Sequence, residues 1–318
     1  GFGSGVPLDP EGRIQEACTR WKKENFFGGA ISINGHAGEA FNVRHRETLE
    51  ANPQMRAYDV YPTSHVPWSE IMKPDANDPS LQALWIADRL ADYSPSRFAI
   101  SVEPADGGGF CVCPWCTAHD RASSQVFGLA KRVADALNDQ HPGAMVSLFA
   151  YNEHAAVPAD PTLQTWLSDS NANVYVMAIP YAFQRTGLSG DELAAAWAAA
   201  KPNNRGIYDY WAIPDWAYCL PSENFARNAN KIRYWKSLGY DGFLAESSTS
   251  AGSVGLLWHS TGRWMFDSND AIESVRESIY TNAFGPAARP MKRMIERWGR
   301  EFLLCDLEIG RSFLDMAE

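Results

Sequence analysis

The sequence predicts an α/β fold, a (β/α)8 barrel of the TIM type. Three observations support this prediction. Short apolar segments bounded by Gly, Pro or Asn alternate with helical segments, six strand candidates occur in this alternation, and no linker rich in Ser, Gly or Pro interrupts it. The alternation implies a parallel sheet, and six or more strand-helix units favour a closed barrel over an open doubly wound sheet, which is the alternative.

The expected strands are short and mostly apolar, as strands covered on both faces should be. In chain order they are GGAISING (28–35), FAISVEP (98–104), AMVSLFAY (144–151), NVYVMAIP (173–180), RGIYDYWA (205–212) and YDGFLAES (240–247).

The expected helices have apolar residues at helical spacing and recognisable ends. They are PSLQALWIADRLADY (79–93), QVFGLAKRVADALNDQ (125–140) after the capping candidates Ser123 and Ser124, SGDELAAAWAAA (189–200) and SENFARNANKIRYWKSLG (222–239). After Glu246 the pattern becomes largely helical. We therefore expect one domain over residues 1–318, irregular at its N-terminus, with a lead-in and first helix in 1–27 and extra helices in 265–318.

Composition excludes two classes of partner. The chain has 318 residues and a net charge of -10, and no run of Lys and Arg exceeds a pair such as Lys22-Lys23, so we expect no nucleic acid partner. No apolar stretch approaches the roughly 18 to 20 residues of a membrane span. The 12 Trp, 12 Tyr and 15 Phe suit stacking on sugar rings, although the filling of a core explains such aromatics equally well.

In a parallel barrel the functional residues lie at the carboxyl ends of the strands. Acids and aromatics at these ends suit the binding and hydrolysis of a carbohydrate, which needs two carboxyl groups and flat apolar surfaces. The residues predicted to bind substrate are His36, Glu103, Asp106, Tyr151, Tyr181, Tyr208, Tyr210, Trp211 and Trp258.

Three carboxylates are candidates for catalysis. Glu246 ranks first, because GFLAE is apolar up to this residue and burial would raise its pKa toward that of a proton donor. Asp209 lies between two tyrosines, and Glu153 follows another strand. The alternative for each is that it caps a helix or pairs with an arginine.

The segment DGGGFCVCPWC (106–116) combines three glycines with a C-x-C-x2-C pattern. Its glycines match neither common nucleotide-binding pattern. Cys111, Cys113 and Cys116 could hold a structural zinc ion, with His119 or Cys219 as the fourth ligand. A disulfide to Cys219 is the main alternative, and a redox-active pair of Cys113 and Cys116 is a third. No cofactor is expected for catalysis.

Several segments together resemble a known family. They are HRETLEANPQMRAY, FAISVEPADGGGFCVCPWCTAHD, FAYNEHAAVP, IYDYW, DGFLAESS and YTNAFGPAARPMKRMIE. In this order they resemble DUF4838, a bacterial glycoside-hydrolase-like family of unknown function that is distantly similar to the barrels of α-glucuronidases, β-hexosaminidases and α-N-acetylglucosaminidases. The resemblance implies a TIM-type barrel, hydrolysis of a carbohydrate and export from the cell. The Asp-Glu dipeptide of hexosaminidases is absent, because Asn152 precedes Glu153.

The sequence thus predicts a glycoside hydrolase that cleaves a polysaccharide or glycoconjugate by carboxylate catalysis. The alternative is a barrel that binds carbohydrate without cleaving it.

Overall fold

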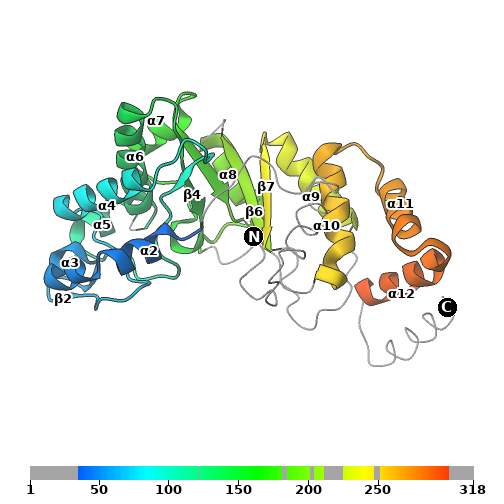
Figure 1. Cartoon of the computed structure of the whole chain (residues 1–318), viewed down its shortest axis with the longest axis horizontal. Helices are drawn as coiled ribbons and strands as arrows, with labels where there is room; N and C mark the ends of the chain where they lie inside the picture. Colours follow the sequence, from blue (N-terminus) through cyan, green and yellow to red (C-terminus); the bar gives the residue numbers. More distant parts are fainter. Residues whose placement is uncertain are drawn as a thin grey trace, which may run out of the picture. The chain divides into compact units, whose positions relative to one another are not determined.

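The computed structural model describes residues 35–120, 122–180, 185–200, 204–210, 225–246 and 251–300 (Figure 1). Side chains of residues 246, 251–254 and 298–300 are outside this description. Contacts within the chain define two units. The sheet unit contains the described residues of Ala30–Asp209 and Leu238–Leu244, and the helical unit contains those of Tyr210–Ser237 and Ala245–Glu318.

A five-stranded sheet has the strand order β3-β4-β5-β6-β7. Its strands are β3 (Ile100–Ser101), β4 (Val146–Ala150), β5 (Val174–Ala178), β6 (Arg205–Tyr210) and β7 (Gly242–Glu246). Parallel pairing joins β3 to β4, β4 to β5 and β5 to β6. Every residue of β4 and β5 is buried, as their continuous apolar sequences predict for strands covered on both faces.

The prediction of a closed (β/α)8 barrel is wrong. The described residues form this parallel half-barrel and a separate two-stranded antiparallel sheet, and the strand order is linear, with β3 and β7 at its ends. Closure needs eight strand-helix units, whereas the sequence offers six strand candidates and becomes helical after Glu246. The first candidate, 28–35, lies almost entirely outside the described residues.

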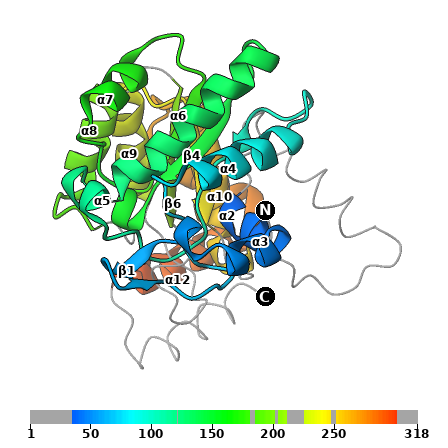
Figure 2. The same cartoon turned by 90° about the vertical axis from the view of Figure 1, so that its left-hand side faces the viewer.

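Helices cover the sheet as the alternation predicts. They are α4 (Pro79–Ala91), α6 (Ser123–Gln140), α7 (Pro161–Ser168) and α8 (Gly190–Ala200). Asp78 caps α4 by accepting a hydrogen bond from the backbone N–H of Leu81, and Asp160 caps α7 through Thr162 and Leu163. The long helix α6 packs on β4 and on α4 (Figure 2).

Short elements before α4 were not predicted. They are α2 (Ala37–Arg44), α3 (Arg46–Ala51), the 3-10 turn η1 (Pro53–Met55) and a hairpin of β1 (Tyr58–Val60) and β2 (Ser64–His65). The five-residue helix α5 (Pro114–Ala118) follows β3, and the 3-10 turn η2 (Asn152–His154) follows β4.

The helical unit contains α9 (Phe225–Ser237), α10 (Ala251–Phe266), α11 (Ile272–Phe284) and α12 (Ala288–Arg300), with the short turn η3 (Gly285–Ala287) between the last two. The predicted helical character after Glu246 is confirmed. Arg233 of α9 donates hydrogen bonds to the carbonyls of Ser268 and Asp270, which joins α9 to the α10–α11 connection. None of the described helices is long and apolar enough to cross a membrane. The expectation of one domain over 1–318 stays a prediction.

Candidate functional site

Polar side chains of the sheet unit gather where β3 and β4 end. Glu103 follows β3, and Tyr151, Glu153 and His154 follow β4 in the turn η2. Because the carboxyl ends of parallel strands meet at one edge of a sheet, residues 51 positions apart in sequence become neighbours here.

Glu103 and His154 form a buried pair at this edge. The Glu103 side chain is 0% exposed and that of His154 is 3% exposed. Glu103 Oε1 lies 3.0 Å from His154 Nε2, and Glu103 Oε2 accepts a 2.8 Å hydrogen bond from the backbone N–H of Phe149. A carboxylate held by two buried donors positions its neighbours, so Glu103 supports the site, and its substrate-binding role stays a prediction.

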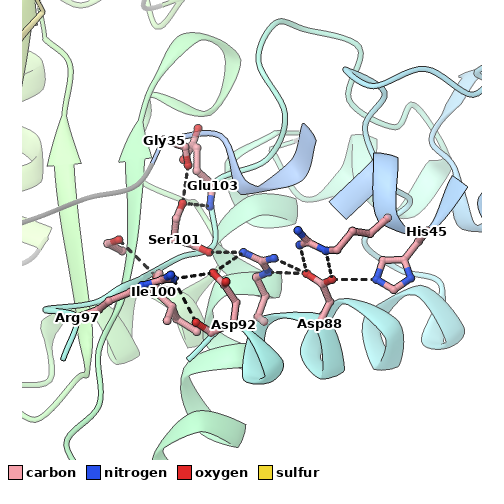
Figure 3. A network of polar contacts seen from close by, with 11 residues as sticks. Gly35, His45, Asp88, Asp92, Arg97, Ile100, Ser101 and Glu103 are labelled. Carbon is pink, nitrogen blue, oxygen red and sulfur yellow. Dashed lines mark hydrogen bonds and ion pairs between the residues drawn. The ribbon is translucent and has the colours of Figure 1, made fainter. Parts of the chain in front are cut away.

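A polar network holds Glu103 from below (Figure 3). Its backbone N–H donates to Ser101 Oγ, which in turn donates to the carbonyl of Gly35. The carbonyl of Ser101 accepts a hydrogen bond from the guanidinium of Arg89, which pairs with Asp88 on the same helix. Helix α4 is thereby fastened to the end of β3.

Asp88 is the centre of this network. Burial alone would raise its pKa, but hydrogen bonds from Arg44 and Arg89 outweigh burial and hold the pKa well below its usual range. The Arg44 contact is bidentate, at 2.9 and 2.8 Å, and His45 Nε2 lies 2.9 Å from the same carboxylate. Asp88 therefore joins α2 and α3 to α4.

His36 lies between two acidic groups. Its Nδ1 atom is 3.1 Å from the carbonyl of Pro104 and 4.0 Å from Glu103 Oε1, and its Nε2 atom is 3.8 Å from Asp106 Oδ1. The side chains of His36 and Asp106 are 26% and 52% exposed, so both remain accessible to a ligand. The structure thus brings together His36, Glu103 and Asp106, all predicted from the sequence.

The glycine-rich loop lies directly against Glu153. A Cβ atom at Gly108 would be 2.3 Å from Glu153 Oε1, so a side chain there would displace the carboxylate. Gly107 and Gly109 have φ angles of +81° and +92°, which favour glycine on both sides of the contact. Glu153 is 17% exposed, and its Oε1 atom lies 3.8 Å from Arg185 Nη1.

Lys73 is a buried cation that the sequence analysis missed. Its Nζ atom donates to the backbone carbonyls of Ala105 and Asp106. Burial lowers the pKa of Lys73 to about 8, against the opposing effect of four carboxylates. These belong to Glu39, Glu103, Asp106 and Glu153. Lys73 is therefore a buried cation that interacts electrostatically with several acidic groups of the site.

Aromatic rings border the same strand ends. Phe149 stacks on Tyr208 with ring centroids 5.2 Å apart, and Tyr151 lies 6.1 Å from His36. Tyr151 and Tyr208 are half-buried, so part of each ring is accessible. The predicted aromatic border is present for these two residues.

The remaining predicted site residues lie on β6, in the helical unit or outside the described residues. Asp209 is 2% exposed on β6, Tyr210 ends β6, and Trp258 is buried in α10 of the helical unit. Glu246 is the last residue of β7, but its side chain lies outside the described part, as do Tyr181, Trp211 and Cys219.

A pocket beside the site is apolar. It is lined by Gly38, Asn42, Met72, Pro74, Ala76, Trp85, Val102, Pro104, Ala105, Phe110, Gln125, Val126 and Leu129. Most of these residues belong to the core between α4, α6 and β3. Since a sugar needs polar partners, the pocket belongs to the core rather than to the candidate site.

A second polar cluster lies behind the glycine-rich loop. Asp75, Cys111, Cys113 and Cys116 are all buried, and their potential ligand atoms lie within 4.8 Å of one another. The cluster could therefore hold a metal ion. None of these three cysteines forms a disulfide. The predicted fourth ligand His119 has its Nδ1 atom 2.7 Å from the carbonyl of Trp115. Asp75 was missed because it precedes Cys111 by 36 residues.

Contacts among the thiols change their ionisation. A hydrogen bond with Cys116 lowers the pKa of Cys111 to about 6. The same contact and burial raise the pKa of Cys116, and burial raises that of Cys113. Burial likewise raises the pKa of Asp75.

Comparison with known protein families identifies the family of the chain. No curated protein sequence matches the chain. The family model DUF4838, described as a domain of unknown function, matches residues 79–296, which include Glu103, Glu153 and the three clustered cysteines. This match spans more than half of the chain and confirms the predicted resemblance to DUF4838, so the chain belongs to the DUF4838 family.

Proposed function

We propose that the chain is a glycoside hydrolase in which Glu153 is one of two catalytic carboxylates. The observation that carries this proposal is the contact between the Glu153 carboxylate and the backbone of the glycine-rich loop at Gly108. The absence of a side chain at Gly108 lets the loop backbone approach this carboxylate closely and fix its position. The neighbouring His36 and Asp106 are accessible and can hydrogen-bond hydroxyl groups.

Glu153 fits the role of nucleophile or general base. Arg185 Nη1 lies 3.8 Å from its Oε1 atom, and either role needs a carboxylate within reach of the anomeric carbon or of the attacking water. The complementary proton donor in this proposal is Asp209, near the end of β6 in the same unit. Glu246, ranked first by the sequence argument, belongs to the helical unit and stays a prediction.

Substrate binding in this proposal uses both polar and aromatic groups. His36 and Asp106 hydrogen-bond the hydroxyl groups of the sugar, and the accessible faces of Tyr151 and Tyr208 stack against its rings. Tyr181, Tyr210, Trp211 and Trp258 stay predictions. The net charge of -10 favours a neutral sugar over an acidic one, although Arg185 Nη1 lies 3.8 Å from Glu153 Oε1.

The metal has a structural role in this proposal. We assign zinc to the cysteine cluster, since thiolates favour zinc among the common divalent ions. All four groups of the cluster are buried, and a closed site of this kind stabilises a fold without contacting substrate.

A substrate screen tests the proposed hydrolysis. The purified full chain is incubated with a panel of aryl glycosides and polysaccharides, and binding of each polysaccharide is measured separately by affinity electrophoresis. We expect release of the aryl group or of reducing ends for at least one sugar. Retardation by a polysaccharide without hydrolysis of any panel member would contradict the proposal and favour the non-catalytic binding protein.

A further inference from the structure

We infer that Asp75 is the fourth ligand of a single zinc ion bound by Cys111, Cys113 and Cys116. The inference rests on the structural zinc of the proposed function, and it is independent of whether the chain hydrolyses a sugar. It replaces both earlier candidates for the fourth ligand, His119 and Cys219.

The spacing of the four groups suits one ion. Zinc binds thiolate sulfur at about 2.3 Å, and a tetrahedron of that size separates its sulfurs by about 3.8 Å. All potential ligand atoms of Asp75 and the three cysteines lie within 4.8 Å of one another. Small side-chain rotations bring such atoms to bonding distance, whereas a polynuclear iron–sulfur cluster would hold the sulfurs farther apart.

The burial of the four groups also favours a bound cation. Cys111 and Cys116 are 0% exposed, Cys113 is 6% exposed and Asp75 is 7% exposed. Acidic groups gathered in an apolar surrounding are stabilised when a cation or metal neutralises them. The surrounding is apolar here, because Ala57, Tyr58 and Val66 pack against the thiols.

Backbone donors support the thiols as metal ligands. Cys111 Sγ accepts hydrogen bonds from the backbone N–H groups of Tyr58 at 3.4 Å and Cys113 at 3.5 Å. Cys113 Sγ accepts one from the N–H of Cys116 at 3.5 Å. Such donors stabilise thiolates and orient them toward a metal.

The earlier candidates are unnecessary once Asp75 is included. His119 is not among the groups whose ligand atoms lie within 4.8 Å of one another, and its ring instead stacks on Trp115, with ring centroids 4.5 Å apart. Three thiolates and one carboxylate already complete a tetrahedron, so Cys219 has no position left in it.

A zinc ion at this site would fasten the glycine-rich loop. Lys73 holds one end of the loop through the carbonyls of Ala105 and Asp106. Asp75, two residues later in the same segment, would hold the other end through the metal. The segment is itself anchored, because the backbone N–H of Asp75 donates to the carbonyl of Met55 at 2.9 Å. Lys73 and the ion would thus together fix both sides of the loop that contacts Glu153.

X-ray absorption of the wild-type protein tests the ligand set without any substitution. The full chain is purified without chelators, its metal content is measured by mass spectrometry, and its zinc-edge fine structure is recorded. We expect one zinc per chain, with three sulfurs at about 2.3 Å and one oxygen at about 2.0 Å. Absence of zinc would overturn the structural zinc itself. Four sulfurs around zinc would overturn only the assignment of Asp75.

Matched variants give a second, independent measurement. Zinc affinity is determined by competition with a chromophoric chelator for Asp75→Asn, Asp59→Asn, Cys219→Ser and His119→Gln. We expect Asp75→Asn to weaken zinc binding by at least about 100-fold, more than the usual loss of a supporting contact. Asp59 is exposed on β1 and controls for loss of a nearby carboxylate. Unchanged affinity in Asp75→Asn, or a comparable loss in Cys219→Ser or His119→Gln, would overturn the inference.

Discussion

Glu103 and His154 are 51 residues apart in sequence, yet their side chains meet at 3.0 Å inside the sheet unit. The contact joins the end of β3 to the turn that follows β4. Glu103 also accepts a hydrogen bond from the backbone N–H of Phe149, so one carboxylate fixes both the end of strand β4 and the histidine beside Glu153. The shape of the candidate site therefore depends on a buried pair of side chains.

The first prediction concerns this pair. Glu103→Gln places an amide NH2 against two groups that both donate to the carboxylate, which leaves one buried donor without an acceptor. We expect the free energy of unfolding to fall by about 1 to 3 kcal/mol, measured by urea denaturation. Asp135→Asn, which removes an exposed carboxylate paired with Lys131 on α6, should cost less than about 0.5 kcal/mol. Equal stability of the two variants would show that the pair is unimportant for folding.

The second prediction concerns the glycine-rich loop. Gly108→Ala should displace the Glu153 carboxylate, because the new Cβ atom would lie 2.3 Å from Oε1. Since a flexible side chain can move away, we expect the stability to change by less than about 1 kcal/mol while turnover of the best substrate falls at least about tenfold.

Gly128→Ala is the matched control for this loop variant. Gly128 lies within α6, and nothing lies within 4 Å of a Cβ atom built there. Replacing a helical glycine by alanine should stabilise the protein by about 0.5 to 1 kcal/mol and leave turnover unchanged. If Gly108→Ala turns over substrate as fast as Gly128→Ala, the contact with Glu153 has no role in the reaction.

The third prediction concerns pH. The folded-state pKa of Asp88 is depressed, so its ion pairs contribute stability above the unfolded pKa of about 3.9, and this contribution is lost as the pH falls toward the folded pKa. Asp88→Asn leaves Arg89, with a side chain 3% exposed, without its nearest carboxylate. We expect it to lower the unfolding free energy by about 3 kcal/mol at pH 7.

Urea denaturation between pH 7 and pH 3 checks this account of Asp88. The difference between the wild type and Asp88→Asn should be constant from about pH 7 to pH 5 and should narrow below about pH 4. A difference that stays the same down to pH 3 would mean that Asp88 contributes through packing rather than through its charge.

The fourth prediction concerns removal of the metal. A strong chelator should lower the thermal unfolding midpoint by several degrees, because the ion fastens the loop between Ala105 and Cys116 to the segment around Asp75. At temperatures below this lowered unfolding midpoint, the metal-free protein should keep most of its turnover of substrate, since the proposed metal site does not contact substrate. An unchanged midpoint after complete loss of zinc, verified by elemental analysis, would contradict a structural role.

Local sequence patterns predicted much of the secondary structure correctly. β4 and β5 are continuous apolar runs, and α4 begins where Asp78 and Pro79 provide a cap and a first turn. β3 is shorter than FAISVEP suggested, because the N–H of Glu103 bonds to Ser101 Oγ and Pro104 has no N–H to donate. Barrel closure could not be inferred, because the pairing of edge strands depends on long-range geometry that alternation does not encode.

The candidate site was only partly predictable for a related reason. His36, Asp106 and Glu153 adjoin or follow expected strands, so the strand-end rule found them. Lys73 and Asp75 lie between a hairpin and α4, in MKPD, where no motif or periodicity marks them. Their roles arise only from contacts with residues more than 30 positions away. The one local indication that Lys73 is buried was its position between Met72 and Pro74.

The central claim is that Glu153 takes part in cleavage of a glycosidic bond, and the activity of Glu153→Gln tests it most directly. The kcat/KM of this variant is compared with that of Asp135→Asn on the best substrate from the panel, with sugar binding measured by calorimetry. We predict a loss of about 100- to 10,000-fold in kcat/KM with binding retained. A Glu153→Gln variant that is within about twofold of Asp135→Asn in kcat/KM would contradict the claim.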